Sequence, residues 1–164
     1  MPNTASDWQL FGQLSAAELY ELLRFRQHIF VVEQRSPYPD LDGLDHDAWH
    51  LSLRAEGGLA GYLRLVPASD PPPTMRIGRV AVAAALRRRG LGGSLMREAL
   101  RFCGAHYPAS DIALSAQTHQ VPFYQHFGFV IASDPYDDFG VLHVDMRLNA
   151  GDVGSWADCP RREC

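Results

Sequence analysis

The stretch LRRRGLGGSL, Leu86–Leu95, sets three arginines against three glycines, directly after the apolar run RVAVAAA and before a long helical pattern. The first N–H groups of a helix have no partner within the helix and carry the positive end of its dipole. Glycines there leave the backbone open to a phosphate, and neighbouring arginines add cationic donors. The stretch therefore predicts a strand, a pyrophosphate-binding turn and a helix. A helix start with close-packed glycines and solvated arginines explains the same letters, and the motif alone leaves both interpretations open.

Two familiar phosphate-binding motifs do not fit this stretch. The dinucleotide fingerprint G-x-G-x-x-G lacks its third glycine, because Leu95 stands at that position. A P-loop requires a lysine, and all 15 of the Lys and Arg residues in this chain are arginine. The lack of lysine also excludes a Schiff-base lysine and a pyridoxal-phosphate anchor.

Length and composition favour an ordinary soluble domain. The chain has 164 residues, 46% of them hydrophobic and 21% charged, which suits one domain with a real core. Its net charge of −4 does not favour nucleic acid or anionic lipid as a partner. No apolar run approaches the roughly 20 residues of a membrane helix, and the N-terminus has no apolar signal core, so a cytoplasmic location is expected. The three cysteines include no Cys-x-x-Cys pair, so neither a disulfide framework nor a metal site is expected.

Hydrophobic periodicity and turn residues predict a mixed α/β fold around one sheet. A capping box, Ser15 to Glu18, begins the first helix, and Cys103 falls on the apolar stripe of a later one. The expected strands are Trp8–Leu14, His50–Arg54, Leu59–Val66, Met75–Val82, Asp111–Ala116, Phe129–Ile131 and Val141–Leu148, and the later helices are Leu91–Cys103 and Val121–Phe127. Residues 1–148 are therefore expected to form the domain, and residues 149–164 a polar, mobile C-terminal tail.

Three segments in order resemble the GNAT acetyltransferase superfamily. Arg87, Gly90 and Gly92 match the R-x-x-G-x-G pattern of its acetyl-CoA loop. The run RVAV, Arg79–Val82, lies where the superfamily has a splayed strand that pairs with pantetheine. FYQHFGF, Phe123–Phe129, resembles the second signature, in which a tyrosine on a short helix faces the coenzyme sulfur. The resemblance spans residues 8–148 and implies a mostly antiparallel sheet with a splayed strand pair, flanked by helices.

The segments FRQHIFVVEQRSPYPDLDGLD and AQTHQVPFYQHFGF look like the ElaA-type branch of the superfamily, whose substrate is poorly defined. The resemblance implies an acetyl-CoA-dependent N-acetyltransferase acting on a primary amine of a small molecule or a peptide, with coenzyme A as product. RFRQHIFVVEQ is also similar to acyl-homoserine-lactone synthases, which share the fold and supply an alternative activity. A non-catalytic acyl-CoA-binding module is the alternative from another class. Such proteins often dimerise through edge strands, so the resemblance allows a homodimer.

The resemblance assigns roles residue by residue. The positions expected to bind acetyl-CoA are Val80, Ala81, Val82, Arg87, Arg88, Arg89, Gly90, Leu91, Gly92, Gly93, Ser94, Gln117, Phe123 and Tyr124. Within them, a strand bulge near Val80–Val82 is expected to free a backbone N–H for the oxyanion. Gln117 stands where the family often has asparagine. Tyr124 is the expected general acid, because a phenol with a pKa near ~10 stays protonated at neutral pH. Packing against the coenzyme is the alternative role of Tyr124.

The general base is left open by the sequence. Some superfamily members place a glutamate on the splayed strand, but this chain has Gly78 and Arg79 there. The remaining candidates are Glu33, His50, His119 and His143. Glu33 is preferred, because it ends an apolar run where burial would raise its pKa.

The acidic loop DLDGLDHD, Asp40–Asp47, does not have the glycine and glutamate positions of an EF-hand. It is expected to line the acceptor side of the site. There its carboxylates, Asp42, Asp45 and Asp47, would attract a cationic amine.

Overall fold

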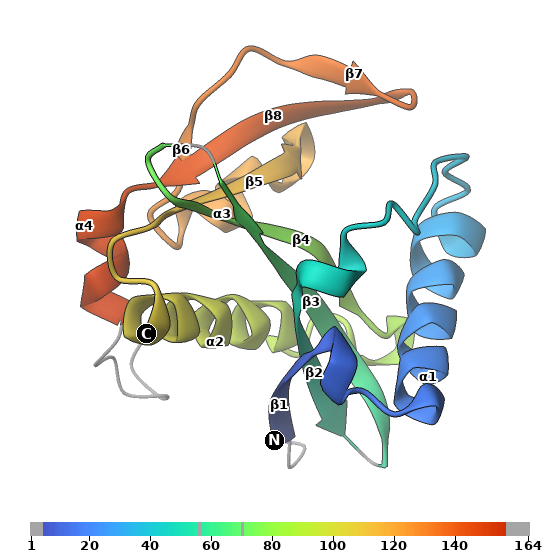
Figure 1. Ribbon diagram of the computed structural model, residues 1–164. Helices are drawn as coiled ribbons and strands as arrows, with labels where there is room; N and C mark the ends of the chain where they lie inside the picture. Colours follow the sequence, from blue (N-terminus) through green and yellow to red (C-terminus); the bar gives the residue numbers. More distant parts are fainter. Residues whose placement is uncertain (1–4, 56, 70, 157–164) are drawn as a thin grey trace. The chain divides into compact units, whose positions relative to one another are not determined.

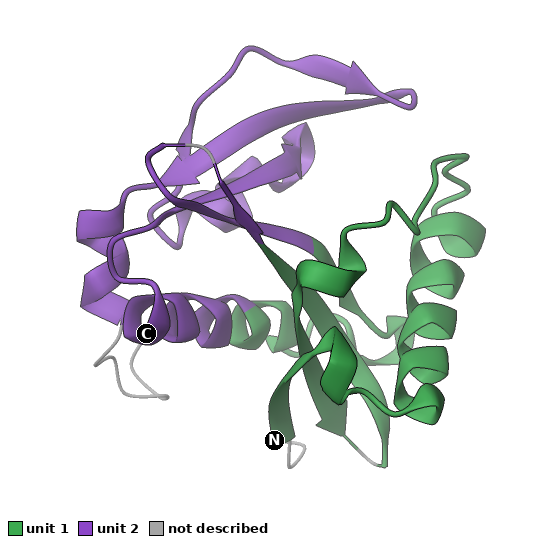
Figure 2. Ribbon diagram, in the orientation of Figure 1, with its two compact units in different colours: residues 1–66, 79–95 green, residues 67–78, 96–164 purple. Residues whose placement is uncertain are grey.

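The computed structural model describes residues 5–55, 57–69 and 71–156. The chain divides into two compact units, each built from two separate stretches of sequence (Figure 2). The first unit comprises Met1–Val66 and Arg79–Leu95, and the second comprises Pro67–Gly78 and Met96–Cys164. Strand β4 (Thr74–Val82) and helix α2 (Leu91–His106) each contribute residues to both units.

The first unit contains an antiparallel meander and the first helix (Figure 1). Strand β1 (Ala5–Leu10) pairs with β2 (Trp49–Ala55), and β2 pairs with β3 (Gly58–Ala68) as the predicted hairpin. Helix α1 (Ala16–Arg26) begins at the predicted capping box: the Glu18 N–H donates to Ser15 Oγ at 3.2 Å, and the Ser15 N–H donates to Glu18 Oε2 at 2.8 Å. The chain then continues as a wider, π-type helix over Gln27–Glu33. This segment, QHIFVVE, contains three β-branched residues and still continues the helix, with Ile29 and Phe30 buried.

The second unit contains the remaining strands. The first half of β4 pairs in parallel with β5 (Asp111–Gln117), which pairs antiparallel with β8 (Val141–Leu148). Strands β6 (Val130–Ile131) and β7 (Tyr136–Asp138) both pair antiparallel with β8. Strand β7 was not predicted, because the letters YDD are short and polar and do not carry a strand pattern. Helix α3 (Val121–Gln125) precedes Gly128, whose φ of +88° completes the predicted helix end.

Hydrogen bonding links the described strands in the order β1-β2-β3-β4-β5-β8-β6, with β7 on β8, so the predicted fold class is confirmed. The sheet has eight strands and is mostly antiparallel, with helices flanking it. The predicted apolar stripe of α2 is buried, and Leu95, Ala99 and Cys103 are 0% exposed. Burial raises the pKa of the Cys103 thiol to about 12, as expected for a small core side chain.

The start of the predicted tail has regular structure. Ala150–Val153 forms helix α4 and Gly154–Trp156 a short 3-10 turn. Val153 is 0% exposed, and the Trp156 ring lies 6.1 Å from that of Phe127. Asn149 initiates this turn because the N–H groups of Asp152 and Val153 donate to its carbonyl oxygen. Cys159 and Cys164 lie outside the described residues.

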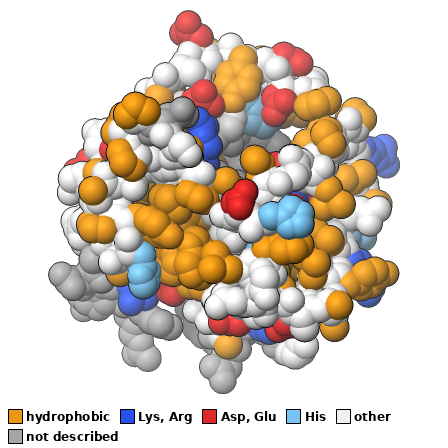
Figure 3. All heavy atoms as spheres, in the orientation of Figure 1, with side chains coloured by type: hydrophobic (Ala, Val, Ile, Leu, Met, Phe, Trp, Pro, Cys, Tyr) orange, Lys and Arg blue, Asp and Glu red, His pale blue; other side chains and the backbone are white. Residues whose placement is uncertain are grey.

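Large apolar side chains are exposed at one end of the strand order. Val130 and Ile131 on β6 are 59% and 51% exposed, and Leu142 on β8 is 54% exposed. Hydrophobic side chains are interspersed with charged and histidine side chains on the face drawn in Figure 3. The expectation of a homodimer formed through an edge strand stays a prediction. None of the helices in the described ranges is long and apolar enough to cross a membrane.

Candidate active site

The strand before the glycine-rich loop (residues 87–94, which include the start of α2) has an irregular backbone. Arg79, within β4, has a φ of +55°, a left-handed conformation that non-glycine residues adopt rarely. The register pairs of β4 with β5 end at Ile77, whereas β4 runs on to Val82. A left-handed residue inside a strand breaks the regular ladder as a bulge does. The sequence predicts a strand bulge near Val80–Val82. The irregular residue in the structure is Arg79, which directly precedes Val80.

The loop itself has the form expected for an anion-binding helix start. Arg88 and Gly90 have φ values of +62° and +80°, and α2 begins at Leu91. A Cβ added to Gly90 would meet nothing within 4 Å, so open space adjoins the backbone there. The Ser94 N–H donates to the Gly90 carbonyl at 3.0 Å, so the N–H groups of Leu91, Gly92 and Gly93 precede the helical ladder. These amides and the exposed Arg88 and Arg89 can hold a diphosphate.

Two side chains of the loop have partners that the sequence did not indicate. The Ser94 hydroxyl, expected at a phosphate, donates to the Gly90 carbonyl at 3.3 Å. Arg87 Nε donates to the Val82 carbonyl at 3.1 Å, and its Nη1 forms a short ion pair with Glu33. The Glu33–Arg87 ion pair joins the end of the π-type helix to the glycine-rich loop, both in the first unit.

Glu33 does not have the raised pKa that was expected. The hydrogen bond from Arg87 lowers the pKa of Glu33 below its ordinary value. The side chain is 31% exposed, so burial raises the pKa less than the guanidinium lowers it. The expectation of a raised pKa is corrected, because a cation from the loop reaches this carboxylate.

The remaining positions predicted to bind acetyl-CoA, Gln117, Phe123 and Tyr124, lie in the second unit. Tyr124, on α3, is 6% exposed, and burial raises its pKa to about 12. Its ring makes edge contacts with Phe123 and Phe129, at centroid distances of 5.0 and 6.3 Å. The hydroxyl of Tyr124 therefore keeps its proton well above neutral pH, as a general acid requires. Gln117 ends β5, directly opposite His143 in the β5–β8 register.

The three histidine candidates have different surroundings. His50 is 1% exposed, with Nδ1 2.7 Å from the Tyr62 hydroxyl and Nε2 2.9 Å from the Asp45 carbonyl. Because a carbonyl only accepts, Nε2 carries the proton and Tyr62 donates to Nδ1, so both nitrogens are occupied. His119 is exposed after β5. His143 donates from Nδ1 to the Val141 carbonyl at 2.8 Å, which leaves the lone pair on Nε2 to accept a proton.

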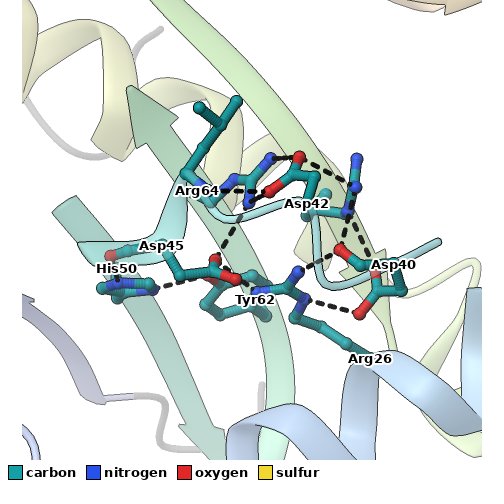
Figure 4. Close-up of polar contacts among 9 residues, drawn as sticks. Arg26, Asp40, Asp42, Asp45, His50, Tyr62 and Arg64 are labelled. Atoms are coloured by element: carbon teal, nitrogen blue, oxygen red, sulfur yellow. Dashed lines mark hydrogen bonds and ion pairs between the residues drawn. The ribbon is translucent and has the colours of Figure 1, made fainter. Parts of the chain in front are cut away.

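The acidic loop takes part in a closed ring of ion pairs, which we call the Arg–Asp ring (Figure 4). In order around the ring, its members are Arg26, Asp45, Arg64, Asp42, Arg79 and Asp40. Burial raises the pKa of Asp42, but hydrogen bonds from Arg64 and from the Leu44 N–H, with nearby cationic charge, lower it to about 2. Asp42 and Asp45 are thus neutralised by arginines, which corrects the expectation that they attract an amine; Asp47 is exposed.

Sequence reasoning missed the basic half of this ring. Arg26 ends an apolar helix face, and Arg64 stands between Leu63 and Leu65, both 0% exposed. An arginine within such an apolar pattern is a signal of a buried ion pair, since a buried guanidinium needs partners. The sequence does not contain the information on which aspartates those partners are.

Comparison with known proteins gives consistent results along the chain. The family model described as an acetyltransferase (GNAT) domain matches residues 16–150. The protein ElaA of Escherichia coli is 38% identical over 144 residues, which cover 85% of this chain and 94% of that protein. An acyl-CoA N-acyltransferase from Pseudomonas aeruginosa has a TM-score of 0.83 at 36% identity, covering 88% and 99% of the two chains. The crystal structure of Escherichia coli ElaA has a TM-score of 0.80 at 37% identity, covering 87% and 99%. The chain therefore belongs to the GNAT acetyltransferase family, in its ElaA-like branch, and is an acyltransferase.

Proposed function

We propose that this protein transfers the acetyl group of acetyl-CoA to the nitrogen of a primary amine. In this reaction a bond forms between the amine nitrogen and the acetyl carbonyl carbon, and the carbon–sulfur bond breaks. The amine loses a proton to a base, and the sulfur receives one from an acid. The observation that carries the proposal is the start of α2, where the N–H groups of Leu91, Gly92 and Gly93 precede the helical ladder beside the arginines of the loop.

The residues of the loop would hold the diphosphate of coenzyme A. Backbone amides from Leu91 to Gly93 point along the helix axis away from α2, and Arg88 and Arg89 add positive charge. Val80–Val82 would donate a backbone N–H to the acetyl carbonyl, as the family resemblance implies. Such fixed donors stabilise the charge that develops on the carbonyl oxygen without having to reorganise.

The loop is tested by calorimetry with coenzyme A on Gly90→Ala. Alanine is strained at a φ of +80°, and its methyl group lies where the phosphate would approach. Gly140→Ala is a matched control, because Gly140 has a φ of +84° and also has nothing within 4 Å. We expect weaker binding by about tenfold or more for Gly90→Ala and unchanged binding for Gly140→Ala. Equal effects in both variants, or no binding by the unaltered protein, would reject the site.

Tyr124 is proposed as the general acid for the departing thiolate. Tyr124→Phe removes only the hydroxyl, and turnover at saturating acetyl-CoA should fall by about a hundredfold. Phe129→Leu is the matched control for ring packing, because Phe129 contacts the Tyr124 ring edge-on at 6.3 Å and lies outside the positions expected to bind acetyl-CoA. Unchanged turnover in Tyr124→Phe would assign the ring a packing role only.

His143 and Glu33 are the two proposed bases that the structure separates most clearly. His143 presents the lone pair of Nε2, whereas the carboxylate of Glu33 is paired with Arg87. We therefore expect His143→Gln to lower kcat. A turnover like that of the unaltered protein would exclude His143.

A thiol-release assay identifies which acyl-CoA donor and which amine acceptor the protein uses. The donors are acetyl-CoA and octanoyl-CoA, and the acceptors are polyamines, amino acids, aminoglycosides and peptide N-termini. A CoA-dependent acyl-homoserine lactone synthase shares the fold, with a TM-score of 0.72 at 19% identity. Preference for octanoyl-CoA would favour this alternative activity. Tight coenzyme binding without thiol release for any amine would favour the non-catalytic module.

A further inference from the structure

The Arg–Asp ring is a buried structure whose cost in desolvation is high. The side chains of Arg26 and Arg64 are 0% and 4% exposed, and those of Asp40 and Asp45 are 6% and 9% exposed. Buried ion pairs often stabilise a protein no more than well-packed apolar side chains of the same volume. Stability alone therefore does not explain why this chain has three pairs of opposite charges in one ring.

Arg79 is the member of the ring that lies nearest to the proposed acyl-binding backbone. Its Nε is 2.8 Å from Asp40 Oδ1, and its Nη2 is 3.0 Å from the Asp40 carbonyl and 3.2 Å from Asp42 Oδ2. The guanidinium also lies over the ring of Tyr38, 5.0 Å from its centroid. These contacts hold the whole guanidinium in one place, and its side chain is 15% exposed.

The backbone of Arg79 is strained at the same point. Its φ of +55° is unfavourable for a residue with a Cβ, and such conformations persist where surrounding structure imposes them. At the other end of this segment, the Ala83 N–H donates to the Ala60 carbonyl at 2.9 Å, and Arg87 Nε donates to the Val82 carbonyl. Residues Val80–Val82 are therefore held on both sides, by Arg79 and by the contacts at Val82 and Ala83.

We propose that Arg79 is a positioning residue, which uses its ion pairs with Asp40 and Asp42 to fix the backbone of Val80–Val82 for the acyl carbonyl. This inference rests on the proposed function, because it assigns the fixed backbone to the acyl group. Asp40 is the central partner, since its carboxylate and its carbonyl each accept from both Arg26 and Arg79. The strand position at which some family members have a glutamate base thus has a structural cation in this chain.

The proposal is tested with Arg79→Ala and Arg79→Gly. Neither variant leaves a ring carboxylate alone, because Asp40 keeps Arg26 at 3.0 Å and Asp42 keeps Arg64 at 2.6 Å. Glycine accepts the left-handed backbone and alanine does not, so Arg79→Gly should have the higher midpoint of urea unfolding. Both variants lack the anchor, and we expect kcat to fall about tenfold to a hundredfold in both, with the KM for acetyl-CoA within about threefold.

A control for a lost ion pair comes from the same unit. Arg54 Nη2 lies 2.6 Å from Glu21 Oε2, and this pair joins β2 to α1 outside the ring. Arg54→Met should leave kcat and the amide exchange of Val80–Val82 unchanged. If kcat instead follows the urea midpoint across Arg79→Ala, Arg79→Gly and Arg54→Met, the role of Arg79 is structural only and the proposal is wrong.

Hydrogen exchange gives a readout that does not depend on activity. In both Arg79 variants, amides of Val80–Val82 should exchange about tenfold faster or more, while those of β2 keep their rates. Equal rates in variant and unaltered protein would overturn the proposal, and so would faster exchange throughout the first unit. If the unaltered protein releases no thiol with any amine, the proposed function fails, whereas the exchange experiment still decides whether Arg79 fixes this segment.

Discussion

At the scale of single residues, Arg87 connects the glycine-rich loop to Glu33. The guanidinium donates to the Val82 carbonyl and pairs with the carboxylate of Glu33. A diphosphate bound at the loop would compete with that carboxylate for the same cation. The ion pair would therefore oppose the binding of a diphosphate there, and it weakens Glu33 as a base because the hydrogen bond from Arg87 lowers the pKa of its carboxyl group.

Glu33→Gln distinguishes competition of Glu33 with the diphosphate for Arg87 from a role of Glu33 as the general base. Because the substitution removes the competing charge, coenzyme A should bind about two- to fivefold more tightly, the equivalent of one exposed ion pair. Calorimetry measures this change, and Glu21→Gln, which releases Arg54 instead, is the control. Unchanged binding would contradict the competition between Glu33 and the diphosphate, and a fall in turnover would indicate that Glu33 is the base.

His50 is expected to make the free energy of unfolding depend on pH. Burial lowers the pKa of His50 below its ordinary value of 6.5. The unfolded chain then binds a proton that the folded chain does not, so this contribution to stability is present above pH 6.5 and is lost as the pH falls toward the lowered pKa. Urea unfolding at a series of pH values should show a shallower loss in His50→Gln than in the unaltered protein. The exposed His119→Gln is the control, and a loss in His50→Gln as steep as in the unaltered protein would contradict the prediction.

At the scale of elements, the approach of β3 to the start of α2 depends on Gly61. A Cβ added there would lie 3.0 Å from Leu95 Cδ1 and 3.3 Å from the Ala81 carbonyl oxygen, all within the first unit. The Leu95 side chain can shift, but the carbonyl oxygen belongs to the β4 backbone. The close approach of these elements therefore requires a residue without a side chain at this position.

Gly61→Ala should lower the free energy of unfolding by about 1–3 kcal/mol, because the extra methyl group overpacks this contact. Gly58→Ala lies on the same strand, where an added Cβ meets nothing within 4 Å. It should change stability much less. Urea unfolding measures both, and equal values for the two variants would show that the Ala81 carbonyl yields without cost.

At the scale of the whole molecule, binding of coenzyme A to the folded chain should raise its free energy of unfolding. A ligand that binds only the folded chain stabilises it by about 2.7 kcal/mol at a concentration of 100 times its Kd. Coenzyme A should therefore raise the urea midpoint of the unaltered protein and of Gly140→Ala, and much less that of Gly90→Ala at the same concentration. An equal rise in all three proteins would place the coenzyme somewhere other than the glycine-rich loop.

The sequence by itself determined the local features of this protein. The capping box at Ser15, the hairpin of β2 and β3, the start of α2 at Leu91 and the extent of β8 depend on side-chain period and turn residues, which neighbours in the chain supply. The mixed α/β class follows from the same local patterns, and the family from the resemblance of the segments at Arg79–Val82, Arg87–Gly92 and Phe123–Phe129 to the GNAT superfamily. Strand β7 was missed because its pairing with β8, rather than its own residues, makes it a strand.

Only the tertiary structure decided the partners of the charged side chains. Arg79 reaches Asp40 across 39 residues of sequence, and Arg87 reaches Glu33 across 54. These partners reversed the expectation for the pKa of Glu33 and neutralise the carboxylates of Asp42 and Asp45. The physical reason is that periodicity shows whether a residue is buried. The pKa and the availability of a buried charge depend on which opposite charge folding brings within a few ångströms of it.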